Sequence, residues 1–428
     1  MKLWTKNDEL DKIIEKFTIG KDRYYDMFLA KYDIIASIAH AKMLQKINLI
    51  SSKEMNLLVK ELNKIKKLIH EDKFIIDEKF EDIHSKIESY LTENLGDLGK
   101  KIHTGRSRND QVLVSLQLLF KDEILNIKLE INKLFKSLIK LSKKNKDYLL
   151  PGYTHLQTAM PSSFGLWFSS YAESLIDDVL FLNTAYKIND QNPLGSAAGY
   201  GTSFEIDREF TTKELGFKEL KYNVLASQMN RGKIEKSLSI ALSSIATTLS
   251  TFCSDICFYM TQELNFISFP NEMTTGSSIM PHKKNPDVFE LIRAKCNSIK
   301  ALPNELILMS NNLTSGYHRD YQIFKGRIID GILDAIECIK VFNYSINKIK
   351  VRKNILDDDK YKFIFSVENL NELVKNGKTF RDSYNQISKE IKNNSFKPNK
   401  TIKHTLIGGI HNLSLDQIEL KMKENFKL

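Results

Sequence analysis

The loop Gly276–Pro286 holds the side chains best suited to chemistry, with the sequence Gly-Ser-Ser-Ile-Met-Pro-His-Lys-Lys-Asn-Pro. Between Gly276 and Pro286, this loop contains two serine hydroxyl groups, two lysine side chains and the amide side chain of Asn285. With the polar residues before it, the loop is about 18 residues long, and an irregular segment of that length is usually functional or disordered. Asn285, Pro286 and Asp287 are typical of an N-cap followed by a helix start. Because helix N-termini favour anions, the loop indicates a mobile flap over an anionic ligand.

A second polar segment, His103–Gln111, reads His-Thr-Gly-Arg-Ser-Arg-Asn-Asp-Gln and opens a long helical pattern. Ser107 as the N-cap, with Asp110 three residues later, predicts a capping box. Capping alone needs neither two arginines nor the amide of Asn109. These donors at a helix start are suited to holding a carboxylate, so we favour a binding site over a cap alone.

Other polar segments lie in turns or at helix starts. Gly152–Pro161 connects two helical patterns and contains His155, although a single loop histidine is more often a satisfied polar residue than a catalyst. Ser315–Gln322 opens the last long helical pattern and, with Lys325, places polar side chains near one end of it. The glycine-rich segment Asn192–Gly201 fits neither a phosphate loop nor a dinucleotide fingerprint and predicts a tight turn.

Long helices must position these segments. No glycine or proline interrupts residues 106–150, where large apolar residues recur at spacings of three and four. The stretch 233–269 is equally uninterrupted, and a straight helix over it would be about 50 Å long, which favours self-association to cover it. Further helical patterns occupy 161–187, 286–302 and 319–350. We therefore expect an all-α protein with a central bundle of five long helices.

The chain has 428 residues, which indicates two or three domains. We expect an N-terminal helical domain over residues 1–104, the bundle over 105–353 and a small C-terminal helical domain over 354–428. The stretch 388–404 is rich in lysine and asparagine and weakly apolar, so it is interpreted as a surface linker. No β-alternating series is evident near either end.

The composition is that of a soluble globular protein, with 42% apolar and 27% charged residues. No segment is expected to cross a bilayer and no signal peptide is evident, so we expect a cytoplasmic protein. The four cysteines are interpreted as reduced, buried thiols. The net charge of +10 comes mostly from dispersed lysines, and no basic stripe with interleaved aromatic residues predicts nucleic-acid binding.

The loop Gly276–Pro286 resembles the G-S-S-x-M-P-x-K-x-N-P signature of the fumarase/aspartase superfamily, whose members release fumarate from succinyl compounds. The segment His103–Gln111 closely resembles that of argininosuccinate lyases and separates them from most of their relatives. The resemblance extends to Lys2-Leu3-Trp4 and to Phe380–Tyr384. It implies cleavage of argininosuccinate to arginine and fumarate, the final step of arginine biosynthesis, without a metal or other cofactor.

The resemblance also implies roles for particular residues. Ser277 is the expected base, activated by Lys283 and loop amides, and His155 the general acid for the leaving nitrogen. Glu290 would favour the imidazolium form if it contacts His155. The reverse assignment, with histidine as base and serine as donor, is the alternative that the sequence leaves open. The substrate-binding residues implied are Arg108, Asn109, Thr154, Asn285, Tyr317, Gln322 and Lys325, with Ser107 and Asp82 as weaker candidates.

Two segments depart from the family pattern. Asp22 aligns where the family usually has a serine ligand, which puts that contact in doubt. Met229–Gly232 replaces the usual Ser-Asp-Arg-Asp element and shares only its arginine.

The candidate segments around residues 109, 155 and 277 are expected at different ends of long antiparallel helices. The family resemblance implies a homotetramer whose sites are built from three subunits. The alternatives are another fumarate-releasing enzyme such as adenylosuccinate lyase, a structural protein on the same scaffold like the delta crystallins, or a basic nucleic-acid binder.

Overall fold

The computed structural model describes residues 11–427, so the resemblance at Lys2-Leu3-Trp4 lies outside the described part of the chain. The described residues fall into two compact units. The first contains the residues up to 127 together with 181–244 and 299–335. The second contains 128–180, 245–298 and the residues from 336 onward. The expected division into three domains stays a prediction.

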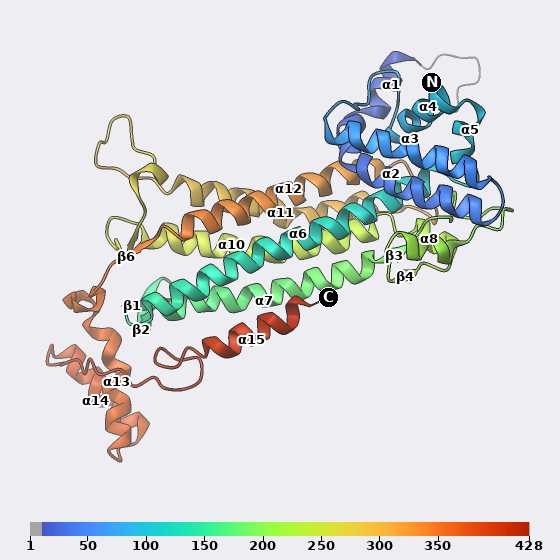
Figure 1. The fold of residues 1–428 in the computed structure, drawn as a ribbon. Helices are drawn as coiled ribbons and strands as arrows, with labels where there is room; N and C mark the ends of the chain where they lie inside the picture. Colours follow the sequence, from blue (N-terminus) through green and yellow to red (C-terminus); the bar gives the residue numbers. More distant parts are fainter. Residues whose placement is uncertain (1–10, 428) are drawn as a thin grey trace. The chain divides into compact units, whose positions relative to one another are not determined.

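Five long helices confirm the all-α class, and each contributes turns to both units. They are α6 (Arg108–Asn145), α7 (Phe164–Asn189), α10 (Lys233–Tyr259), α11 (Asp287–Met309) and α12 (Tyr321–Ile346). Within each unit, segments of these helices lie side by side (Figure 1). Their apolar stripes are buried, as at Phe120 on α6, Phe168 on α7 and Phe324 on α12.

The predicted helix over 233–269 is wrong at its end. α10 stops at Tyr259, where the amide of Phe266 donates to the Tyr259 carbonyl and Asn265 takes a positive φ of 44°. The chain then forms β5 (Ile267–Ser268), which pairs with β6 (Lys350–Val351). The 27 residues of α10 correspond to about 40 Å of helix, not 50 Å.

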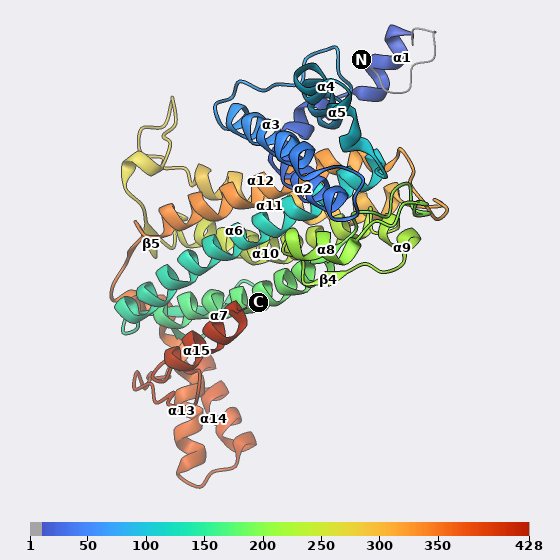
Figure 2. The ribbon, with the colours of Figure 1, turned by 45° about the vertical axis from the view of Figure 1, so that its right-hand side comes forward.

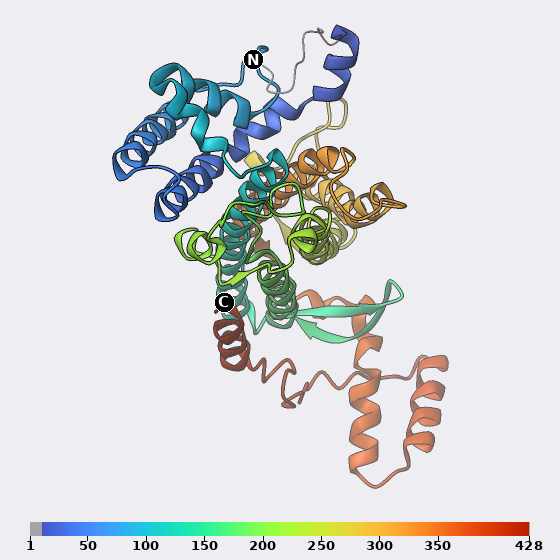
Figure 3. The same cartoon turned by 90° about the vertical axis from the view of Figure 1, so that its right-hand side faces the viewer.

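The predicted helix start at residue 161 is also wrong. The connection between α6 and α7 is a β-hairpin, formed by β1 (Leu149–Thr154) and β2 (Gln157–Ser163), and α7 begins only at Phe164. His155 and Leu156 form its two-residue turn, both with positive φ, as a type I′ turn requires. Figure 3 shows the two strands as a ribbon projecting from the start of α7.

The first unit also contains a group of helices near the start of the chain. They are α1 (Lys12–Ile19), α2 (Asp22–Lys46), α3 (Ser52–His70), α4 (Ile83–Leu95) and α5 (Asp97–Lys100). Buried apolar residues of α2, α3 and α4, among them Leu44, Leu62 and Ile87, form their common core. Figure 2 shows α2, α3, α4 and α5 packed together. Two smaller helices, α8 (Arg208–Glu214) and α9 (Val224–Gln228), and the paired strands β3 (Gln191–Asn192) and β4 (Glu219–Leu220) complete the main elements.

The second unit ends in α13 (Ser366–Lys375), α14 (Phe380–Lys392) and α15 (Leu415–Phe426). α14 extends into the expected linker, because Ser383 and Ile387 bury one face of an amphipathic helix. α15 is anchored by the buried Lys128, whose ammonium group donates to the Phe426 carbonyl at 3.0 Å. Burial lowers the pKa of Lys128 to about 8.

One expectation about membranes needs correction. α10 is long and apolar enough to cross a bilayer by length and composition, whereas no segment was expected to be. Half of its most apolar stretch is buried inside the protein, and it carries Glu235 and Ser239 at fully buried positions. These features are those of a core helix in a soluble protein.

Candidate functional site

A cavity of about 170 Å³ in the first unit gathers most of the predicted binding residues. It is lined by Asp22, Asp26, Glu81, Asp82, Arg108, Asn109, Val112, Arg231, Tyr317, Arg319, Gln322 and Lys325. These come from α2, the segment before α4, the start of α6, the turn before α10, the turn before α12 and the first turns of α12. The lining contains four acidic and four basic side chains. A ligand that fits it therefore meets both signs of charge.

The start of α6 is fixed by local polar contacts. The Ser107 amide donates to Asp110 at 2.9 Å, which is one half of the predicted capping box, whereas the Ser107 hydroxyl accepts from the Asn109 amide at 3.3 Å and not from the Asp110 amide that a full capping box uses. Asp110 also accepts from the amides of Gly195 and Ala197, each at 3.0 Å. The glycine-rich turn thus supports the helix that presents Arg108 and Asn109. Burial raises the pKa of Asp110 to about 6.

Lys325 is held between two carboxylates of α2. Its ammonium group pairs with Asp22 at 2.6 Å and with Asp26 through a second hydrogen bond. The other Asp26 oxygen accepts from the Ile83 amide at 3.0 Å, which ties α4 to the pair. Burial raises the pKa of Asp22 to about 6, although the attraction of Lys325 opposes that shift. Asp22, doubtful from the sequence, therefore lines the cavity and contacts a predicted binding residue.

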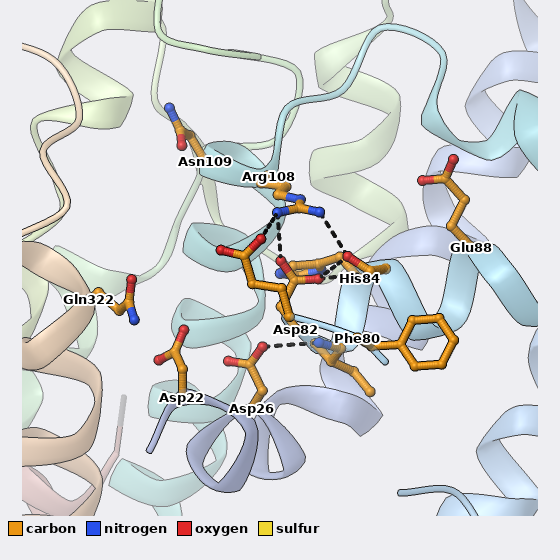
Figure 4. Close-up of polar contacts among 12 residues, drawn as sticks. Asp22, Asp26, Phe80, Asp82, His84, Glu88, Arg108, Asn109 and Gln322 are labelled. Carbon is orange, nitrogen blue, oxygen red and sulfur yellow. Dashed lines mark hydrogen bonds and ion pairs between the residues drawn. The ribbon is translucent and has the colours of Figure 1, made fainter. Parts of the chain in front are cut away.

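Arg108 is surrounded by acceptors, as the dashed lines in Figure 4 show. It contacts Glu81 at 3.0 Å, Asp82 at 3.2 Å and the Ser85 hydroxyl at 2.8 Å. The family resemblance suggested Asp82 as a weaker candidate for binding substrate. In the structure, Asp82 pairs with this chain's own Arg108 and caps α4 by accepting from the Ser85 amide at 2.8 Å.

Glu81 and Arg319 were missed as site residues. Glu81 contacts Arg108 through one oxygen and Arg319, at 3.0 Å, through the other, so it links the starts of α6 and α12. Arg319 in turn donates to the Gln322 side chain at 3.1 Å. The signal that could have found them is adjacency, because each lies next to or within a segment already singled out.

A buried histidine lies behind this cavity. His84, next but one to Asp82 in the chain, hydrogen-bonds the fully buried Asp33. Burial alone would lower the pKa of His84, but the adjacent carboxylates of Asp33 and Asp82 raise it above its usual value. Asp33 also accepts from Ser37, whose hydroxyl accepts from Arg106 at 2.9 Å. The acidic wall of the cavity thus rests on a buried, charged network.

The hairpin turn of the second unit carries Thr154 and His155. Thr154 pairs with Gln157 across the turn, and both Thr154 and His155 are exposed. Glu290 is exposed in the first turn of α11. Among residues 11–427 the structure records no hydrogen bond or ion pair between His155 and Glu290, so their expected contact is absent in this conformation.

The predicted flap is an irregular loop whose two ends are joined. The Asn285 amide donates to the Thr275 carbonyl at 2.9 Å, and Thr275 hydrogen-bonds Asp287 through its side chain. The expected N-cap at Asn285 is wrong by one residue, since α11 begins at Asp287. The Asn285 side chain instead donates to the Thr275 hydroxyl at 3.3 Å.

Within the flap, the Ser277 hydroxyl accepts from the amides of Ile279 and Met280, at 3.3 and 3.1 Å. Two amide donors aimed at one oxygen stabilise negative charge on it. Lys283 is exposed, and among the described residues it makes no recorded hydrogen bond to Ser277. The structure therefore contains the loop amides expected around Ser277, without the expected lysine contact.

Known proteins resemble this chain over nearly its whole length. The family model described as "Lyase" matches residues 5–300. The argininosuccinate lyase of Phocaeicola vulgatus is 50% identical over 99% of this chain and 95% of its own length. That of Thermotoga neapolitana is 41% identical over 91% of this chain and 98% of its own length.

Solved structures of low sequence identity share the fold. An EDDS lyase in complex with formate has a TM-score of 0.78 at 17% identity, and the match covers 98% of this chain and 91% of that one. A class II fumarase from Schistosoma mansoni has a TM-score of 0.71 at 17% identity, with 96% and 95% covered. From the family match and the identity to its relatives, the chain is a lyase and belongs to the argininosuccinate lyase family.

Proposed function

We propose that this enzyme cleaves argininosuccinate to arginine and fumarate by β-elimination, as the final step of arginine biosynthesis in the cytoplasm. The observation that carries the proposal is the mixed charge of the cavity in the first unit. Argininosuccinate carries carboxylates together with an ammonium and a guanidinium group, so its recognition needs fixed cations and fixed anions together. Arg108 and Lys325 supply the cations, while Asn109, Tyr317 and Gln322 supply neutral polar groups.

The difficult step is removal of a proton next to a carboxylate, because that group then carries a second negative charge. Ser277 is the proposed base, and the amides of Ile279 and Met280 that donate to its oxygen would stabilise its alkoxide. Lys283, Asn285 and the amides at the start of α11 would meet the dianionic intermediate. Closure of the flap over the substrate would bring Lys283 into this environment.

His155 is the proposed general acid for the leaving nitrogen, with Thr154 beside it as a substrate contact. Its place at the tip of a hairpin leaves the imidazole exposed, free to meet a substrate or another subunit. Glu290 would then favour the imidazolium form across the assembled site. The alternative is the opposite direction of proton transfer, with His155 as the base. A structure with the substrate trapped in the site would distinguish the two assignments.

We infer that the complete site is shared between subunits of a homotetramer. The cavity is lined only by residues of the first unit, while Ser277 and His155 belong to the second. Each of the five long helices carries at least one large apolar side chain that is between 46% and 65% exposed in the single chain. These side chains are Leu129, Phe181, Ile240, Leu291, Leu308 and Tyr344. Their exposure supports burial of these faces in a helical core built from several subunits.

The test is incubation of the purified protein with argininosuccinate while arginine and fumarate are followed together. Equal molar release of both products is expected. Release of fumarate from adenylosuccinate but not from argininosuccinate would favour the neighbouring enzyme class, and no release from either substrate would favour a purely structural protein. Salt-dependent retention of DNA or RNA without turnover would point to a nucleic-acid binder.

A further inference from the structure

The hairpin β1–β2, which carries Thr154 and His155, is supported by the C-terminal part of the second unit. Two 3₁₀ helices that follow β6, η3 (Ile355–Asp357) and η4 (Asp359–Phe365), pack against it, η3 on β1 and η4 on β2 (Figure 3). Buried residues of both strands lie near the base of the hairpin, whereas residues 154–158 at its tip are exposed. The proposed general acid is thus held in place through the base of its hairpin.

Tyr153 is the last packed residue of β1 before the exposed tip. Its ring contacts the ring of Phe258 edge to face, with centroids 5.2 Å apart and planes at 82°. The pairing of the strands shifts between Pro151 and Tyr153, where two residues of β2 oppose Gly152. A bulge of this kind increases the local twist and re-aims neighbouring side chains. The bulge therefore influences how Tyr153 is directed, immediately before the residues proposed to act on the substrate.

The hydroxyl of Tyr361 is a neighbour of Tyr153. Tyr361 lies on η4 and is 3% exposed, and its ring contacts that of Phe266 with centroids 6.1 Å apart. Burial raises the pKa of Tyr153, and the nearby Tyr361 raises it further. Among residues 11–427, however, no hydrogen bond of good geometry is recorded for the buried Tyr361 hydroxyl. An unpaired buried hydroxyl is unfavourable, so its presence here needs a reason.

The Tyr153 hydroxyl can supply the missing partner, because a phenol both donates and accepts hydrogen bonds. A bond between the two tyrosines would tie the last packed residue of β1 to η4. It would restrict the tip of the hairpin without touching the substrate. Small errors in the placement of a reacting group slow a reaction strongly, so such a restriction matters for the proton transfer proposed for His155.

We propose that Tyr361 is a positioning residue, whose hydroxyl forms a hydrogen bond with Tyr153 when the hairpin takes its catalytic position and thereby aligns Thr154 and His155 with the substrate. This inference rests on the proposed function, since it names the part of the chain that places the general acid. It gives the C-terminal segment a role in the reaction as well as in the fold.

The first experiment is steady-state kinetics on Tyr361→Phe, which removes the hydroxyl and keeps the ring. The value of kcat for argininosuccinate should fall by about five- to tenfold, the effect of one hydrogen bond. KM should stay within about twofold, because the cavity of the first unit is unaltered. The unfolding free energy should not fall, since the hydroxyl has no recorded partner in this conformation.

A double-mutant cycle identifies the partner of Tyr361. Tyr153→Phe should lower kcat by a similar factor, and the double variant should be no slower than either single variant, because both changes remove the same bond. The matched control is Tyr171→Phe, in the same unit, which removes a hydroxyl that donates to Asp255 at 2.7 Å. It should lower the unfolding free energy and leave kcat unchanged.

Hydrogen exchange gives a readout that does not depend on turnover. The hairpin of the free protein is expected to visit the bonded arrangement, so amide exchange in the peptide spanning residues 153–157 should be at least about twofold faster in Tyr361→Phe. Tyr171→Phe should leave exchange in this peptide unchanged.

An unchanged kcat in Tyr361→Phe would overturn the inference, and so would effects of Tyr153→Phe and Tyr361→Phe that multiply in the double variant. A loss of unfolding free energy as large as that of Tyr171→Phe would reduce Tyr361 to a structural residue. Fumarate release by the wild type is measured in parallel. If fumarate is released while kcat and exchange do not depend on Tyr361, the inference fails alone. If no fumarate is released but exchange in the hairpin depends on Tyr361, only the proposed reaction fails.

Discussion

The two groups of candidate site residues differ in how much of their environment is already built. In the cavity of the first unit, Lys325 and Asp26 are buried and nearly every charged group has an opposite partner. In the second unit, His155 and Lys283 are exposed, and among residues 11–427 the hydrogen bonds recorded for the Ser277 hydroxyl are those from its own loop. The side chains proposed to bind the substrate are thus already held in place. Those proposed to transfer protons would be positioned only when the substrate or another subunit is present. Substitutions in the first group should therefore cost stability, and those in the second should cost activity.

The largest effect is expected from Lys325→Met, which tests the stability side of this comparison. It leaves Asp22 and Asp26 facing one another in a buried cavity without their cation. Breaking a buried ion pair in this way costs about 3–5 kcal/mol of unfolding free energy. Chemical denaturation measures the loss. The control is Lys283→Met, which removes an exposed lysine and should change the unfolding free energy by less than about 0.5 kcal/mol. If Lys325→Met and Lys283→Met lower the unfolding free energy equally, the two groups of site residues do not differ in their contribution to stability.

Ser277→Ala tests the activity side. Turnover should fall by about a hundredfold or more, as expected for a proton-transfer group, with the unfolding free energy nearly unchanged because the loop is exposed. Steady-state kinetics with argininosuccinate gives kcat and KM separately. The control is Ser254→Ala, which removes a hydroxyl that donates to the Ser250 carbonyl within α10 of the same unit. Near-normal turnover in Ser277→Ala would remove that residue from the mechanism.

The effect of pH on arginine affinity is intermediate in size. The pKa of Asp22 is raised to about 6 by burial, with Asp26 also raising it and Lys325 and Arg231 lowering it. Above this pH the carboxylate is charged and can accept from an ammonium group, and below it a proton occupies the site. The dissociation constant for arginine should therefore rise as the pH falls below about 6, by up to tenfold per pH unit. The same titration of Asp22→Asn should lack this rise.

The sequence predicted the elements better than their ends. Uninterrupted apolar periodicity was enough to place all five long helices, because burial of a helical stripe dominates their stability. It did not reveal the end of α10, which depends on Asn265 taking a positive φ and on pairing of Ile267 with the distant Val351. The hairpin β1–β2 was missed for a similar reason, since its turn residues His155 and Leu156 are not typical of a type I′ turn.

The residues that line the cavity were predictable where they belong to continuous segments. Arg108 and Asn109, and likewise Gln322 and Lys325, each lie within one short stretch that reads as polar at a helix start. Asp26 was not, because its role comes from its contact with Lys325, far along the chain. Adjacency to Asp82 could have drawn attention to Glu81, but it could not reveal the contact of Glu81 with Arg319. Spacing within one helix reveals neighbours on that helix only, so long-range ion pairs need the fold.

The smallest effect is expected at the turn of the hairpin. Leu156 has a φ of 59° and a side chain that is 76% exposed, so it bears the strain of a left-handed conformation without packing in return. Such a conformation costs a non-glycine residue about 1–2 kcal/mol, while glycine gives back up to about 1 kcal/mol through the entropy of its unfolded chain. Leu156→Gly should therefore raise the unfolding free energy by about 0.5–1 kcal/mol. Thermal unfolding followed by calorimetry measures it. If Leu156→Gly instead destabilises the protein, Leu156 is covered in the assembled enzyme, and the hairpin tip belongs with the packed regions rather than with the exposed ones.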